Sequence, residues 1–207
     1  MIEIELTREE WTYAAARGCE RQIDGLVRGR TPSQATRQQQ ASEGWAWNIN
    51  GAAGESVVAK WLGVPWDGAF GNLTASDVAG LLEVRTAFTH DRLLYLRKTD
   101  RDDGVFILVT GVGPSWRIQG FIRGAKGKRE EWFHDHPQGR AARNVAYWVP
   151  RDELNRQILE LIGDDSVSNE AISRAGLGAA LKALAARGWL ESLERPEPVP
   201  RAGPGRA

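Results

Sequence analysis

The sequence predicts an α/β fold, a mixed sheet flanked by helices, followed by a small helical module. Three observations predict it: helical patterns before residue 65, short apolar runs in series between residues 78 and 149, and renewed helical periodicity after residue 150. At 207 residues, the chain can form one well-packed domain and a small extra module. We therefore expect three parts, with the last one disordered: residues 1–150, 151–194 and 195–207.

Two helices are expected in the N-terminal part. Thr7 is placed to cap the first, which continues to about residue 28. The polar stretch 29–43 predicts a loop or a frayed helix. The second helix is expected over residues 51–63, because paired glycines stand near its start and Gly63 is placed to end it.

Strands are expected in the middle of the chain, where apolar residues alternate or run together. Their expected ranges are 78–88, 93–97, 105–111, 116–122 and 146–149. The polar segment 98–104 separates two of these runs and predicts a hairpin.

The first of these strands has one apolar face and one charged face. Side chains alternate along a strand, so Glu83 and Arg85 point to the face opposite Val84. Asp77 precedes Glu83 by six residues, and the glycine between them permits a tight turn or bulge. We therefore expect the two carboxylates to converge.

Glu55 lies on the second expected helix. Val58, Ala59 and Leu62 follow it at helical spacing, so the carboxylate shares the face that should be buried. A buried charge needs a cation, a metal or a hydrogen-bond network as its partner. Buried carboxylates with such partners often mark functional sites.

These residue types suit a divalent metal and a phosphodiester. Mg²⁺ takes oxygen ligands, commonly one or two carboxylates with waters and phosphate oxygens. Asp77 and Glu83 could supply such ligands, and Arg85 could hold a phosphate oxygen with its planar fork. The alternative is that Asp77 is a turn residue and that Glu83 and Arg85 form a structural ion pair.

The residues 51–63 and 76–85 resemble the PD-(D/E)XK nuclease superfamily, which has the restriction-endonuclease-like fold, and in particular its small phage-encoded members. The resemblance extends from about residue 11 to residue 150. It implies that Asp77 and Glu83 bind Mg²⁺ or Mn²⁺, with Glu55 as an accessory ligand, and that the protein is a metal-dependent DNA endonuclease.

Arg85 stands where the superfamily pattern has lysine. Lys60 and Lys98 are candidates for a lysine that has moved, but neither has a compelling spacing. The alternative function is therefore a catalytically inactive nuclease-fold protein that acts as a DNA-binding or interaction factor.

The residues after 150 resemble a helix-turn-helix or half winged-helix module. A third amphipathic helix, which has its apolar residues over 177–184 and ends at Gly188, would occupy the recognition position. Arg174, Lys182 and Arg187 are its exposed basic candidates for binding DNA. Such a unit could equally serve for packing or dimerisation, so a homodimer stays open.

Composition limits the classes of partner and compartment. A net charge of zero gives no global attraction to DNA, so contacts must come from local patches such as the arginine-rich residues 17–37, which could equally be a solvated surface. A single cysteine and the lack of any long apolar run predict a cytoplasmic protein without a membrane span. His134, Asp135 and His136 are more typical of a polar loop than of a zinc site, and the nine tryptophans are more typical of a core.

Overall fold

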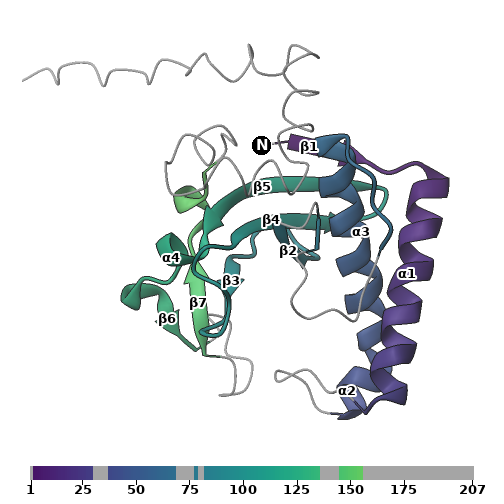
Figure 1. Ribbon diagram of the computed structural model, residues 1–207, viewed down its shortest axis with the longest axis horizontal. Helices are drawn as coiled ribbons and strands as arrows, with labels where there is room; N and C mark the ends of the chain where they lie inside the picture. The colour runs from purple at the N-terminus through teal and green to yellow at the C-terminus, as the bar shows by residue number, and fades with distance from the viewer. Residues whose placement is uncertain (1, 30–36, 69–76, 79–81, 136–144, 156–207) are drawn as a thin grey trace, which may run out of the picture.

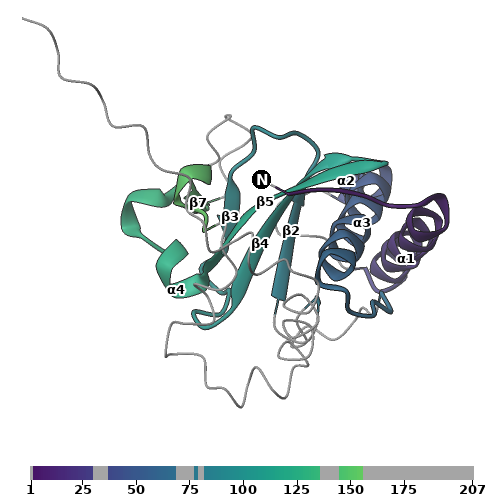
Figure 2. The same cartoon turned by 90° about the horizontal axis from the view of Figure 1, so that it is seen from above.

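Two long helices, a four-stranded sheet and a three-stranded sheet lie in successive layers in the computed structural model (Figures 1 and 2). The structure describes residues 2–29, 37–68, 77–78, 82–135 and 145–155. Helix α3 lies between the four-stranded sheet and the outer helix α1, and the smaller sheet lies on the other side. The prediction of a mixed α/β fold is confirmed. Residues 156–194 of the predicted C-terminal module and the tail 195–207 lie outside the described residues.

Helix α1 (Arg8–Val27) begins where its capping residue predicts. The Thr7 hydroxyl accepts from the Glu10 backbone N–H at 3.2 Å, and the Thr7 N–H donates to the Glu10 carboxylate at 2.7 Å. These reciprocal bonds satisfy two donors that a helix start would otherwise leave unpaired.

Helix α3 (Gly44–Leu62) starts earlier than expected, and a short helix α2 (Arg37–Ser42) precedes it. The polar stretch 29–43, predicted as a loop or a frayed helix, thus contains a short helix, which is held by the fully buried Gln22 of α1. Its amide nitrogen donates to the Gln40 carbonyl at 2.6 Å, and its oxygen accepts from Asn48 at 2.9 Å. Tertiary hydrogen bonds thus stabilise helix where local composition does not. Gly63 ends α3 at a φ of 67°, as predicted.

The four-stranded sheet has the order β1-β5-β4-β2 and is mixed. Its strands are β1 (Ile2–Glu5), β5 (Ser115–Arg123), β4 (Val105–Val112) and β2 (Leu82–Ala87). β2 is parallel to β4, while β4 with β5 and β1 with β5 are antiparallel. β2 therefore forms one end of the sheet, and β1 is a strand that the sequence prediction missed.

The three-stranded sheet has the order β3-β7-β6. Its strands are β3 (Leu94–Leu96), β7 (Ala146–Val149) and β6 (Phe133–His134). The predicted hairpin over residues 98–104 is wrong, because β3 pairs with β7 and this segment crosses between sheets. Leu94 and Leu96 share an apolar cluster with Phe106 and Leu108 of β4, so the two runs pack face to face rather than edge to edge.

Short helical segments precede and follow strands β6 and β7 of the second sheet. They are α4 (Gly124–Gly127), η1 (Glu130–Trp132) and η2 (Arg151–Glu153). Trp132 lies in this part of the core, and Trp61, Trp116 and Trp148 are also buried, which confirms the expected packing role for these tryptophans. Trp45 is 37% exposed and lies outside that core.

Candidate functional site

Glu55 lies on the buried face of α3 and is held by an arginine of α1. Arg21 donates Nη1 to Glu55 Oε1 and Nη2 to Oε2, each at 2.5 Å. The two side chains are 16% and 7% exposed, so the pair is largely removed from water. The prediction that Glu55 is buried and has a partner is confirmed, and the partner is a guanidinium group.

The segment after α3 adds a further donor to Glu55. Trp66 Nε1 donates to Glu55 Oε2 at 3.3 Å, and the indole meets the Tyr13 ring edge-on with centroids 5.8 Å apart. The Tyr13 hydroxyl donates to the Asp67 carbonyl at 3.0 Å. These contacts fold the segment back against α1, so Glu55 is enclosed by α1, α3 and an indole.

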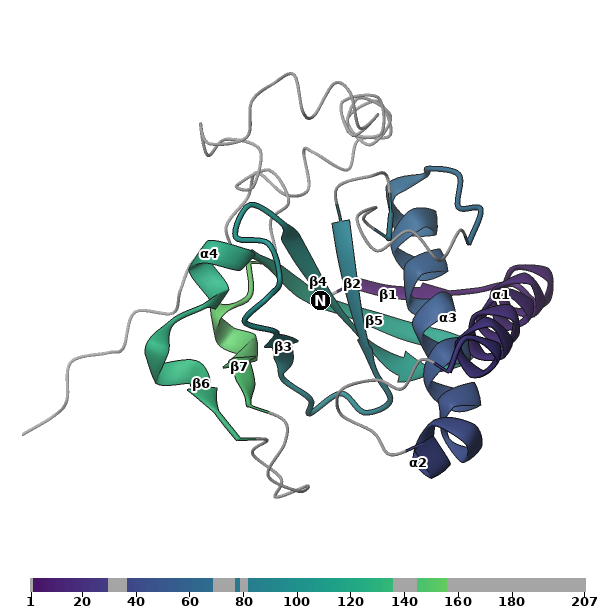
Figure 3. The same cartoon turned by 60° about the horizontal axis from the view of Figure 1, so that its bottom comes forward.

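Helix α3 approaches β2 closely because residue 54 is glycine (Figure 3). A Cβ at Gly54 would collide with Thr86 Oγ1 and lie 3.1 Å from Thr86 Cγ2. The missing side chain therefore allows the two backbones to come together. Glu55, the next residue, therefore lies on the helix that packs against this face of β2.

The two faces of β2 differ, as the alternation of the sequence predicts. Leu82 and Val84 are buried in the apolar cluster to which α3 contributes. Glu83 and Arg85 point to the opposite face, where Phe106 packs with the second sheet. The helix that carries Glu55 and the pair Glu83–Arg85 thus lie on opposite sides of β2.

Asp77 lies at the edge of β2 that faces away from β4, next to Val78, which forms a bridge with Leu82. Asp77 Oδ2 accepts from the Val84 N–H at 2.7 Å, where a further strand would otherwise supply a carbonyl oxygen. The carboxylate interacts electrostatically with Arg21 and with Arg85. Asp77 therefore links the Arg21–Glu55 pair on one side of the strand to Arg85 on the other.

Arg85 is fixed by two acids and two aromatic rings. Its Nη2 donates to Asp100 Oδ2 at 3.0 Å, and Nη1 lies 3.6 Å from Glu83 Oε2. The guanidinium carbon lies 5.5 Å from the centroid of Tyr95 and 5.1 Å from that of Phe106. The predicted alternative of a Glu83–Arg85 ion pair is therefore present, within a larger set of contacts.

Burial raises the pKa of both central carboxylates. For Glu55, burial is the largest influence and the charge of Asp77 adds to it, while Arg21 lowers the pKa. For Asp77, burial raises the pKa more than the Val84 N–H, Arg85 and Arg21 lower it. Both acids therefore bind a proton more tightly than usual, although guanidinium groups adjoin them.

The candidate residues are connected in a chain rather than gathered around one point. Glu55 and Asp77 both interact with Arg21, whereas Asp77 and Glu83 both interact with Arg85. Among the described residues, no three His, Cys, Asp or Glu side chains are placed to hold one metal ion together.

Two residues of this network were not predicted as members of the site. Arg21 follows the buried Ala14 and Gly18 by seven and three residues, so the helical spacing that identified Glu55 could also have identified Arg21. Asp100 lies in an irregular segment, where no periodicity indicates the direction of a side chain.

The other candidate residues lie elsewhere or outside the described part of the chain. Lys60 donates to Glu10 and to the Glu5 carbonyl, and Lys98 lies over the Phe133 ring at 5.8 Å. His134 ends β6 rather than lying in a loop. Outside the described residues lie His136, Arg174, Lys182 and Arg187.

Comparisons with family models, with curated proteins and with solved structures gave no match. Among the residues that the structure describes, no helix combines the length and apolar character needed to cross a membrane.

Proposed function

We propose that the protein is a metal-dependent DNA endonuclease with a site centred on Asp77. The observation that carries the proposal is the charge of the connected groups. Four carboxylates face two guanidinium groups: Glu55, Asp77, Glu83 and Asp100 against Arg21 and Arg85. The exposed Arg101 also interacts with Glu83, but it is paired with Asp103. Among the described residues, the carboxylates named here outnumber the two guanidinium groups, which favours the binding of an added cation.

The donor chemistry of these residues fits Mg²⁺ or Mn²⁺. Mg²⁺ needs only one or two carboxylates, because water and substrate phosphate complete its shell. Asp77 and Glu83 would supply the carboxylates, with Glu55 as the accessory acid. A bound ion would lower the pKa of a water molecule and neutralise charge at phosphorus. It would also relieve the burial penalty that raises the pKa of Asp77 and Glu55.

Arg21 and Arg85 suit the phosphate. Each has an Nε that is buried and has no hydrogen-bond partner among the described residues. A buried donor without an acceptor is unfavourable, so an added anionic oxygen would stabilise these groups. The planar fork of a guanidinium binds phosphate through two hydrogen bonds. Neither arginine can act as a general base, because guanidinium stays protonated.

Plasmid cleavage tests the proposal. The full-length protein is incubated with supercoiled plasmid and Mg²⁺, Mn²⁺ or Ca²⁺, beside Asp77→Asn, Glu83→Gln and the exposed control Glu20→Gln. We expect the parent and the control to nick or cut the DNA with Mg²⁺ or Mn²⁺, and the other two variants to leave it intact. Intact DNA with every ion would reject the nuclease proposal.

Metal binding can be measured separately from cleavage. Trp66 donates to Glu55, so its fluorescence should respond when an ion alters that carboxylate. We expect Mn²⁺ to change the emission of the parent protein, and Trp66→Phe to lose most of that change. Asp77→Asn should show no saturable response, because it lacks the central carboxylate.

A catalytically inactive, DNA-binding or interaction protein is the second candidate. One observation favours it: Arg21 engages both oxygens of Glu55, so a guanidinium takes a position that a metal would need. This candidate predicts intact plasmid, no Mn²⁺ response, and gel shifts of DNA that persist in Asp77→Asn.

A further inference from the structure

Lys128 holds the segment that crosses between the two sheets. Its ammonium group donates to three oxygens of that segment: the Lys98 carbonyl at 3.3 Å, Asp102 Oδ1 at 2.6 Å and the Asp100 carbonyl. A lysine ammonium has three N–H donors, so these contacts use all of them. The Lys128 side chain is only 14% exposed, so its ammonium group is a largely buried partner of residues 98–104.

The same segment places the carboxylate that holds Arg85. Asp100 Oδ2 accepts from Arg85 Nη2 at 3.0 Å and from the Arg97 backbone N–H at 2.8 Å. Lys128 bonds to the backbone carbonyl of Asp100, while the Asp100 side chain points to Arg85. The contacts therefore run without a gap from Lys128 through Asp100 to the cation of the candidate site.

We propose that Lys128 and Asp100 are positioning residues that fix the Arg85 guanidinium beside Asp77. This inference rests on the proposed nuclease function and explains how an arginine serves where the superfamily pattern has lysine. A lysine could reach a phosphate as a point charge, whereas a planar guanidinium must also be oriented. Asp100 sets that orientation at one edge, while Tyr95 and Phe106 lie against the group.

The Lys128 contact can be removed without detaching the segment. The backbone N–H groups of Gly124 and Ala125 donate to the carbonyls of Gly104 and Asp102, each at 2.8 Å. These bonds remain in Lys128→Met, so we expect this variant to fold. Thermal unfolding followed by circular dichroism checks that it does.

Nitrogen-15 NMR of the arginine side chains tests the positioning directly in the full-length protein. The Arg85 signals are assigned by their loss in Arg85→Lys. We expect slow rotation of the Arg85 guanidinium in the parent and fast rotation in Lys128→Met and Asp100→Ala. Arg85 signals that stay unchanged in folded Lys128→Met would overturn the inference.

Cleavage kinetics give a second readout. We expect Asp100→Ala and Lys128→Met each to lose about 10–100-fold in cleavage rate, the range for loss of an outer-shell partner. If both act through Arg85, the double variant should lose no more than Asp100→Ala alone. Losses that multiply would indicate independent structural effects and overturn the inference.

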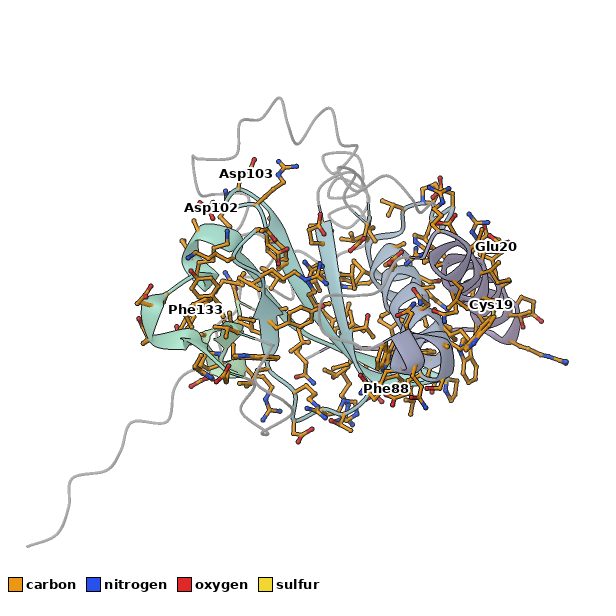
Figure 4. The ribbon with its side chains drawn as sticks, turned by 90° about the horizontal axis from the view of Figure 1, so that it is seen from below. Cys19, Glu20, Phe88, Asp102, Asp103 and Phe133 are labelled. Carbon is orange, nitrogen blue, oxygen red and sulfur yellow. The ribbon has the colours of Figure 1, made fainter. Side chains whose placement is uncertain are left out.

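A matched control comes from the same segment. Figure 4 shows Asp102 and Asp103 together beside β4, and Asp103 is 72% exposed and paired with Arg101. Asp103→Asn would free Arg101 to act on Glu83, so the control is instead Thr99→Ala, an exposed position that should leave the Arg85 signals and the cleavage rate unchanged. If the parent cuts no DNA with any ion, the nuclease proposal fails, and the NMR result alone decides whether Lys128 orients Arg85.

Discussion

Arg21 and Glu55 join α1 to α3 through two parallel hydrogen bonds in a largely buried setting. The pair has a structural role, because it ties the outer helix to the helix that lies against the sheet. The pair also limits the chemistry of the site, because both carboxylate oxygens of Glu55 already accept hydrogen bonds from Arg21. The proposed metal site therefore predicts that stability and metal binding are coupled at this pair.

Replacing Arg21 with methionine should destabilise the protein by about 3–5 kcal/mol, since it leaves a buried carboxylate without its cation. The loss should depend on pH. The pKa of Glu55 is already raised by burial, and removal of Arg21 raises it further. An acid with a raised folded pKa loses stability as pH rises through that pKa, so the deficit should be larger at pH 8 than at pH 5. Urea unfolding at both pH values measures it.

The double variant Arg21→Met with Glu55→Met is the control for that experiment. Replacing a buried ion pair by apolar side chains of similar size is often neutral or stabilising. We therefore expect the double variant to recover most of the lost stability and its pH dependence. A double variant as unstable as Arg21→Met alone would show that the pair does not account for the effect.

The sequence predicts those features of the site that follow from local periodicity. Helical spacing placed Glu55 on a buried face, and strand alternation placed Glu83 and Arg85 on one side of β2. Neither pattern could show that α3 with Glu55 lies on the opposite side of β2 from Glu83 and Arg85. This arrangement depends on which face of the sheet α3 covers. Only the close approach of Gly54 to Thr86 decides it.

Two departures from the sequence prediction have a tertiary cause. The segment 29–43, predicted as a loop or a frayed helix, contains the ordered helix α2, and Gln22 bonds to its Gln40 from another helix. The expected hairpin is a crossover because Leu94 finds its strand partner in Val149, far along the chain. Turn composition indicates that the chain changes direction, but it does not indicate which sheet the next strand joins.

Asp77→Asn should stabilise the protein at pH 7 in the absence of metal. Burial raises the pKa of Asp77, so its charged form is unfavourable, and an asparagine oxygen can still accept from Val84. We expect a rise in Tm of a few degrees, since ~1 kcal/mol shifts Tm by roughly 2–4 °C in a chain of this size.

The dependence on pH and on metal shows whether the stabilisation by Asp77→Asn comes from the removal of a buried charge. Because the folded pKa of Asp77 is raised, the parent loses stability as pH rises through it, so the gain of the variant should vanish near pH 4. Scanning calorimetry with Mg²⁺ should raise the Tm of the parent but not that of Asp77→Asn. A variant less stable than the parent at pH 7 would contradict the prediction.

Arg85→Lys should keep cleavage within about tenfold of the parent, whereas Arg85→Gln should abolish it, because the phosphate needs a positive charge at this position. The lysine variant should also lose about 0.5–1 kcal/mol of stability, since it gives up contacts with the rings of Tyr95 and Phe106. Initial rates on plasmid and denaturant unfolding measure the two effects. Faster cleavage by Arg85→Lys would instead identify the arginine as an impairment.

Gly54→Ala should destabilise the protein by about 1–3 kcal/mol, because the added Cβ collides with Thr86 and pushes α3 away from β2. Thr86→Ala removes the Oγ1 and Cγ2 atoms that the added Cβ would meet. Thr86→Ala should therefore restore stability in the double variant, although alone it should be neutral or mildly destabilising. Thermal unfolding of the parent, the two single variants and the double variant gives the coupling energy between positions 54 and 86. Gly51→Ala is the matched control on the same helix, since a Cβ there meets no atom within 4 Å. If Thr86→Ala fails to rescue Gly54→Ala, the contact that sets the distance between α3 and β2 is not the one described.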